Sequence, residues 1–317
     1  MVLSRAAPLL LVALIAAGCG GAGESEPREA PEPSGEAAEP APVRTEPDPA
    51  PAPPPRDRES KAPLLDRRDA QSFDALQTRL GGEVGITVGT PGDADSEQLG
   101  SLRTGSAWST IKVPIAAGVL EAAGGPKALS TAQQGLIGRA ITASDNAAAD
   151  ALFASLGPDD EQAAAATGGV LREAGDATTR VSAKGRDGFS PYGQTEWSLE
   201  EQHRFMALLA AGDCLADPAS SRYLLELMAQ IVADQQWGLG SAGAGAARFK
   251  GGWGPGTDGR YLVRQMGVIE VDGEDVVVTL AVVAPDGQFA TGTAAATELA
   301  RWVARNVDPG EAQAVKC

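Results

Sequence analysis

The chain of 317 residues has one histidine, few aromatic residues and a deficit of positive charge. Because His203 is the sole imidazole, a metal site made of several histidines is excluded, and a Ser-His-Asp triad would have to use this residue. There are 26 Lys and Arg against 42 Asp and Glu, for a formal net charge of −16. Nucleic-acid binding needs clustered cations, so this balance argues against such a partner. We expect neither a metal nor a cofactor.

The N-terminal residues have the pattern of an export signal. Arg5 supplies positive charge, and the apolar run 9–17 is too short for a membrane-spanning helix, which needs about 20 residues. The run ends in Ala-Ala-Gly-Cys19, which resembles a bacterial lipobox, whose cysteine carries the lipid. We therefore expect residues 1–19 to be a lipoprotein signal peptide. Lipidated Cys19, with palmitate or similar chains, would then hold the protein on the extracytoplasmic side of the cell membrane. An ordinary cleaved signal is the alternative.

A proline-rich segment separates this signal from the rest of the chain. Residues 20–63 contain 12 of the 22 prolines, together with Glu and Ala and almost no large apolar residues. Such a composition predicts a disordered, extended linker. Residues 64–317 remain as one domain. Cys214 and Cys317 lie in it and are a candidate disulfide pair in an exported protein, although the sequence does not show that their Cα atoms approach.

Strand-like segments lie near both ends of this domain, and helical patterns fill its middle. Residues 84–89 alternate like a strand, and further strands are predicted at 248–253, 261–271 and 276–283, with Asp272-Gly273 as a hairpin turn. Helical patterns are found at 65–80, 111–122, 130–171, 198–211, 219–233 and 293–307. This order predicts an α/β domain in which an all-helical lobe is inserted between the strands of an antiparallel sheet.

Ser109-Thr110-Ile111-Lys112 is the first motif whose residues could take part in catalysis. Positions i and i+3 share a helix face, so the hydroxyl and the amine can meet. A serine hydroxyl becomes a good nucleophile only when a base accepts its proton. Lysine can be that base if burial lowers its pKa, and the neighbouring residues are apolar. Alone the pattern is common, and Ser109 would equally serve as a helix N-cap.

Two further motifs follow along the chain. Ser144-Asp145-Asn146 lies within the helical region and has the alternative interpretation of a helix cap, because all three residue types favour helix N-termini. Lys250-Gly251-Gly252 ends a strand-like run, where glycine lets a ligand backbone approach closely.

Together, and in this order, the three motifs resemble the set used by class A β-lactamases and penicillin-binding proteins. The resemblance extends to the stretches STIKVPIAAGVL, RAITASDNAAADALFASLG, LREAGDATTRV and GRYLVRQMG and covers roughly residues 65–307. It implies the β-lactamase/transpeptidase-like fold, with an antiparallel five-stranded sheet flanked by helices and an inserted all-helical lobe. It also implies a monomer that acts on a small molecule or a peptide.

The resemblance implies a role for each matching residue. The catalytic residues would be Ser109, Lys112, Ser144 and Lys250, and the substrate-binding residues Asn146, Gly252, Trp253 and Arg260. Ser109 would attack a carbonyl while Lys112 takes its proton, and Ser144 would pass a proton to the leaving group. Backbone N–H groups of Ser109 and Trp253 would form the oxyanion hole, and the guanidinium of Arg260 would bind a substrate carboxylate.

Three departures from the family pattern stand out. The Ω-loop glutamate that activates the deacylating water would fall at or next to Gly185, where the sequence has no Glu; Asp187 and Glu196 are the carboxylates nearby. The usual Lys-Thr-Gly is Lys-Gly-Gly followed by Trp253, whose indole would favour an apolar acyl group. The link between Ser109 and Ser144 is short, which implies a more open site.

These observations favour a cell-envelope serine hydrolase that forms an acyl-enzyme through Ser109 on an amide, peptide or ester, with peptidoglycan as one candidate source. A slow or atypical β-lactamase is the first alternative. A non-catalytic lipoprotein that uses the cleft for binding is the second, and the intact motifs argue against it.

Overall fold

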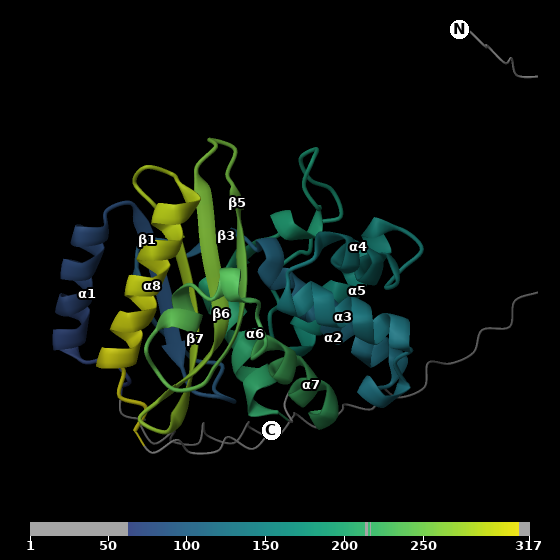
Figure 1. Cartoon of the computed structure of the whole chain (residues 1–317), viewed down its shortest axis with the longest axis horizontal. Helices are drawn as coiled ribbons and strands as arrows, with labels where there is room; N and C mark the ends of the chain where they lie inside the picture. The colour runs from purple at the N-terminus through teal and green to yellow at the C-terminus, as the bar shows by residue number, and fades with distance from the viewer. Residues whose placement is uncertain (1–62, 213–214, 216, 311–317) are drawn as a thin grey trace, which may run out of the picture. The chain divides into compact units, whose positions relative to one another are not determined.

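A computed structural model of the chain describes residues 63–212, 215 and 217–310 (Figure 1). Its main sheet has five antiparallel strands in the order β2-β1-β7-β6-β5. These strands are β1 (Glu83–Gly89), β2 (Glu97–Gly100), β5 (Ala247–Pro255), β6 (Tyr261–Val271) and β7 (Glu274–Val283). A small second sheet pairs β3 (Thr104–Ser106) with β4 (Glu196–Ser198). The predicted five-stranded antiparallel sheet is confirmed.

The hairpin between β6 and β7 has the predicted two-residue turn. Val271 pairs with Glu274, and both turn residues, Asp272 and Gly273, have positive φ angles of 51° and 89°. A two-residue turn of this kind matches the twist of the flanking strands. The turn therefore sets the register of the two central strands.

Helices cover both faces of the main sheet (Figure 1). They are α1 (Arg67–Leu80), α2 (Lys112–Ala123), α3 (Thr131–Thr142), α4 (Asn146–Ala154), α5 (Asp160–Glu173), α6 (Leu199–Ala211), α7 (Pro218–Met228) and α8 (Phe289–Asn306). Helices α1 and α8 lie on one side of the sheet, and α6 and the lobe formed by α2–α5 and α7 lie on the other. The α/β architecture with an inserted helical lobe is thus confirmed.

The helical region expected over 130–171 is divided into three helices. Ser144, between α3 and α4, has a φ of 57°, which a continuous right-handed helix does not permit. The carboxylates of Asp145 and Asp159 then cap α4 and α5 by accepting hydrogen bonds from backbone N–H groups. The break places the Ser144-Asp145-Asn146 motif in the bend between two helices.

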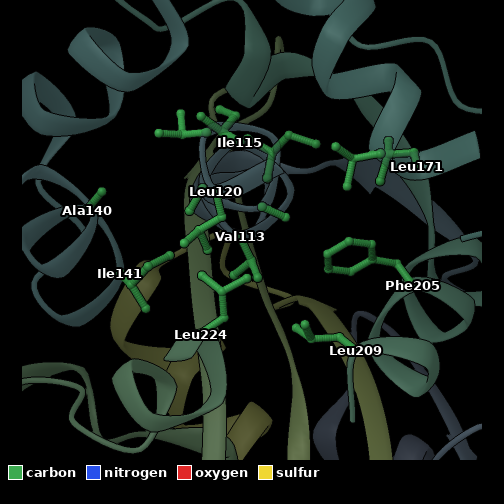
Figure 2. Close-up of a cluster of buried hydrophobic side chains, with 14 of the residues drawn as sticks. Val113, Ile115, Leu120, Ala140, Ile141, Leu171, Phe205, Leu209 and Leu224 are labelled. Atoms are coloured by element: carbon green, nitrogen blue, oxygen red, sulfur yellow. The ribbon is translucent and has the colours of Figure 1, made fainter. Parts of the chain in front are cut away.

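Helix α2 runs through the centre of the lobe and is buried at every position from Lys112 to Leu120. Figure 2 shows its apolar side chains surrounded by those of α3, α5, α6 and α7, among them Ile141, Leu171, Phe205 and Leu224. A helix that is apolar on all sides is stable only in such an interior position. Because Lys112 is the first residue of this helix, its amine is carried into the protein interior.

Several predicted features lie outside the described residues. They are the signal segment, Cys19, the linker up to residue 62, and the two other cysteines, Cys214 and Cys317. Within the described residues, none of the helices is long and apolar enough to cross a membrane.

Candidate active site

Ser109 lies at the edge of a cavity of about 860 Å³, together with Lys112, Ser144 and Asn146. It belongs to a short 3-10 helix, Trp108–Ile111, that leads directly into α2. Trp108 has a φ of 48°, a left-handed conformation that is rare for a bulky residue and costs roughly 1–3 kcal/mol. Strain of this kind is typical of functional sites, and here it lies directly before Ser109.

Lys112 is 1% exposed, and its amine is held by two acceptors. The Nζ atom donates to the backbone oxygen of Ser144 at 2.6 Å and to Oδ1 of Asn146 at 2.7 Å. Burial lowers the pKa of Lys112 to about 8, although the charges of Asp150 and Asp145 oppose this. A neutral amine has two N–H groups, so these two bonds leave its lone pair free to accept a proton. Ser109 borders the same cavity, although no direct hydrogen bond joins it to Lys112 among the described residues.

Lys250 connects the edge strand β5 to the helical lobe. It has no solvent exposure, and its Nζ donates to Oγ of Ser144 at 2.8 Å and to the backbone oxygen of Gly251 at 2.9 Å. Burial, and then the charge of Lys112, lower the pKa of Lys250 well below its usual value. The structure therefore brings Lys112, Ser144 and Lys250 into one polar network beside Ser109.

The glycines of β5 permit close packing against the Ser109 segment. A Cβ atom at Gly252 would lie 2.8 Å from the backbone nitrogen of Ser109, and one at Gly254 would overlap the indole of Trp108. Only glycine allows so close an approach. Glycine at position 252 therefore lets β5 lie directly against the backbone N–H of Ser109. This N–H is the expected first donor of the oxyanion hole.

The indole of Trp253 does not face Ser109 as the sequence suggested. Successive residues of a strand point to opposite faces, so Trp253 lies opposite to Gly252 and Gly254. Its ring packs against Phe289 on α8, with ring centroids 5.4 Å apart, and against Trp237 at 6.1 Å. Trp253 still borders the cavity at the strand edge.

Arg260 lies in the turn between β5 and β6 and is not among the residues that line the cavity. Its guanidinium forms ion pairs with Asp258 at 2.7 Å and with Glu83 at 3.2 Å. The structure therefore does not place this side chain where it could bind a substrate carboxylate beside Ser109.

The loop that was expected to carry the deacylation base offers none at the predicted positions. Gly185 has no side chain, and the space where its Cβ atom would lie is taken by the side-chain amide of Gln194. Asp187 is exposed and does not line the cavity, nor does Glu196, which accepts a hydrogen bond from the Ser106 hydroxyl at 3.2 Å.

The carboxylates that do line the cavity, Asp150 and Asp160, were missed by the sequence analysis. Asp150 accepts a 2.5 Å hydrogen bond from the hydroxyl of Tyr192, and burial raises the pKa of that tyrosine. The position of Asp150 four residues after Asn146, on the same face of α4, was a usable signal. His203 is fully buried elsewhere, and desolvation lowers its pKa to about 4, so it takes no part in this cavity.

A serine near a buried lysine, a second serine held by a second buried lysine, and an antiparallel sheet with a helical lobe together define a β-lactamase/transpeptidase-like scaffold. The family model of the Beta-lactamase enzyme family matches residues 125–307. The chain belongs to this family. The matched region includes Ser144 and Lys250 and begins after Ser109 and Lys112.

Solved structures with low sequence identity share the fold. An ancestral class A β-lactamase is 23% identical, with a TM-score of 0.57 over 74% of this chain and 98% of that one. A β-lactamase from Chitinophaga pinensis is 17% identical, with a TM-score of 0.61 over 75% and 98%. A point mutant of PBP-A, in an acyl-enzyme complex with penicillin G, is 19% identical, with a TM-score of 0.57 over 75% and 95%. No curated protein matches the chain by sequence.

Proposed function

We propose that this protein is a serine hydrolase that forms an acyl-enzyme through Ser109 and acts on an amide, a peptide or an ester. The observation that carries the proposal is the state of Lys112. Its amine is buried, has a lowered pKa and directs two N–H groups at fixed acceptors, Ser144 O and Asn146 Oδ1. An amine in this state can accept the Ser109 proton at neutral to mildly alkaline pH.

The reaction would proceed in two stages. Ser109 Oγ attacks the substrate carbonyl carbon, and its proton passes to Lys112. Backbone N–H groups of Ser109 and Trp253 receive the developing oxyanion. When the bond to the leaving group breaks, that group takes a proton from the Ser144 hydroxyl, and the proton that Lys112 took from Ser109 passes to Ser144 within the Lys112–Ser144–Lys250 network, so that both lysines return to their starting state. Water then attacks the ester carbonyl and releases the acid from Ser109.

Slow β-lactam hydrolysis is the second candidate, because it is the activity that gives the family its name. Its weakness is the deacylation step, since neither Gly185, Asp187 nor Glu196 supplies a base that lines the cavity. A purely binding role is less well supported, because it gives no reason for two buried lysines in hydrogen bonds with one serine.

Labelling of Ser109 tests the proposed function. Intact-mass spectrometry after incubation with a fluorophosphonate and with benzylpenicillin should show one covalent adduct on the wild-type protein and none on Ser109→Ala. Ser190→Ala is the matched control, because Ser190 borders the same cavity. Equal labelling of wild type and Ser109→Ala would refute the mechanism.

We also propose that Cys19 carries the lipid that anchors the enzyme on the extracytoplasmic side of the membrane. The lipobox-like ending and the proline-rich linker support this proposal. Membrane fractions of cells that express wild type or Cys19→Ala provide the test: the variant should move to the soluble fraction. Unchanged membrane association would refute lipid anchoring.

A further inference from the structure

Aromatic side chains are concentrated around the active-site cavity of a chain that is only 4% aromatic. Six of the residues that border the cavity are aromatic, although the Trp253 indole itself packs against α8: Trp108, Phe153, Phe189, Tyr192, Trp253 and Tyr261. Aromatic rings in a concave site of this volume provide apolar surface for a ligand of small-molecule size.

Phe189 stands out because its ring is not needed for the core. Phe189 is 39% exposed, and no other large hydrophobic residue in the described part of the chain is classed as exposed. It packs edge-on against Trp108, with ring centroids 5.5 Å apart. Trp108 directly precedes Ser109, so this pair of rings forms a wall next to the nucleophile. We call Trp108 and Phe189 the aromatic wall.

Arg186 holds the aromatic wall in place. Its guanidinium lies 4.9 Å from the centroid of the Phe189 ring and donates to the backbone oxygens of Pro255 at 2.6 Å and Gly256 at 3.2 Å. The loop that carries Phe189 is thereby fastened to the end of β5 across the cavity.

Gln194 binds the start of the same loop at Arg186. Its side-chain oxygen accepts hydrogen bonds from the backbone N–H of Arg186 at 2.9 Å and from Nε of that residue at 3.1 Å. A surface that is already fixed in this way binds a ligand with little further loss of conformational entropy.

The charge of the cavity disfavours an anionic acyl group. Asp150 and Asp160 line it, and the one basic side chain among its lining residues is Lys112, whose N–H groups are donated to Ser144 and Asn146. No guanidinium lines the cavity in the described residues. A substrate carboxylate would therefore lack the bidentate partner that such groups usually require.

We propose that the substrate of this enzyme is an ester or amide whose acyl part is uncharged and carries an aromatic ring, which packs on the aromatic wall. This proposal rests on the proposed function and adds the substrate class. Because Trp108 directly precedes Ser109, a ring that packs on the aromatic wall would lie next to the carbonyl that Ser109 attacks. A phenylacetyl group is the simplest probe of this chemistry.

Three p-nitrophenyl esters with the same leaving group test the proposal: acetate, cyclohexylacetate and phenylacetate. The p-nitrophenol burst reports acylation of Ser109, and each rate is divided by the hydroxide-catalysed rate of the same ester. Wild type should acylate with phenylacetate at least ~10-fold faster than with acetate, because the ring is buried on binding, and faster than with cyclohexylacetate, which cannot stack as a flat ring.

Phe189→Ala should reduce the ratio of the phenylacetate rate to the acetate rate about threefold to tenfold, the scale of one aromatic pair. Phe189→Tyr keeps the ring and should keep the preference. Arg186→Ala should lower the preference because the loop loses its attachment to β5. Lys184→Ala is the matched control: Lys184 lies in the same loop, and its exposed amine forms an ion pair with Glu161, away from the aromatic wall.

A wild-type ratio near one, or a ratio that Phe189→Ala does not change, would overturn the proposal. So would the absence of acylation by all three esters in a protein whose Ser109 still reacts with a fluorophosphonate. By contrast, loss of fluorophosphonate labelling at Ser109 would contradict the proposed function itself, so the two failures are distinguishable.

Discussion

The amine of Lys250 lies 2.8 Å from the hydroxyl oxygen of Ser144 and has no contact with solvent. This hydrogen bond joins strand β5 to the bend between α3 and α4, two segments 106 positions apart. Because the amine is buried and its pKa is lowered well below the usual value, it can exchange a proton with Ser144 rather than act as a fixed charge. This hydrogen bond is the basis for the proposed role of Ser144 in protonating the leaving group.

Ser144→Ala should therefore affect substrates according to their leaving groups. An amine expelled from a β-lactam or an amide must be protonated, whereas p-nitrophenolate leaves without a proton. We expect acylation by benzylpenicillin to slow by roughly 10²- to 10⁴-fold and acylation by a p-nitrophenyl ester to change far less. Stopped-flow acylation rates with both compounds provide the measurement. An equal loss with both would mean that Ser144 acts only by holding the structure.

The pH dependence of acylation should follow the Lys112 amine. Its pKa in the folded protein is lowered to about 8, and only the neutral form can accept the Ser109 proton. The acylation rate should therefore rise with pH and level off above about 8. Lys112→Ala should slow acylation at least ~100-fold and abolish this rise.

Asp150→Asn should shift the same profile in a predictable direction. The negative charge of Asp150 raises the pKa of Lys112 against the larger effect of burial. Its removal lowers that pKa further, so the rise in rate should move to lower pH. Asp160→Asn is the control, because Asp160 borders the cavity and is not among the groups that shift the Lys112 pKa. A profile that moves to higher pH in Asp150→Asn would contradict the assignment.

Gly254→Ala should damage both stability and acylation. The new methyl group would overlap the Trp108 ring, and overpacking of this kind typically costs about 1–3 kcal/mol of unfolding free energy. Because Trp108 directly precedes Ser109, the displaced ring would also move the nucleophile. Gly138→Ala is the control: nothing lies within 4 Å of a Cβ atom in that helix, so a gain of about 0.4–1 kcal/mol is expected. Urea unfolding and acylation rates compare the two variants.

A penicilloyl-enzyme on Ser109 should persist for minutes or longer. Deacylation needs a base that holds water against the ester, and the expected position of that base, at or next to Gly185, carries no glutamate. Loss of a positioned base typically slows a reaction by roughly 10²- to 10⁴-fold. A pulse-chase with labelled benzylpenicillin measures the lifetime. Clearance within a second would show that another carboxylate activates the water, and the candidates that line the cavity are Asp150 and Asp160.

The sequence alone was sufficient for features that depend on short-range geometry. The placement of Ser109 and Lys112 beside one cavity follows from the helical spacing of i and i+3, and the alternation of strand residues predicted the sheet. The Asp272-Gly273 turn followed from its residue types, since both positions need a positive φ angle. The order of the three motifs indicated the family that the comparisons then supported.

Tertiary structure decided every feature that depends on how separate elements pack. It turned the Trp253 indole toward α8, engaged Arg260 with Asp258 and Glu83, and placed Tyr192 against Asp150. These contacts join residues far apart in the chain, and local spacing says nothing about which side chains then meet. Burial is decided in the same way: the lowered pKa of Lys112 arises because α2 lies at the centre of the lobe, where neighbouring helices exclude water from its first residue.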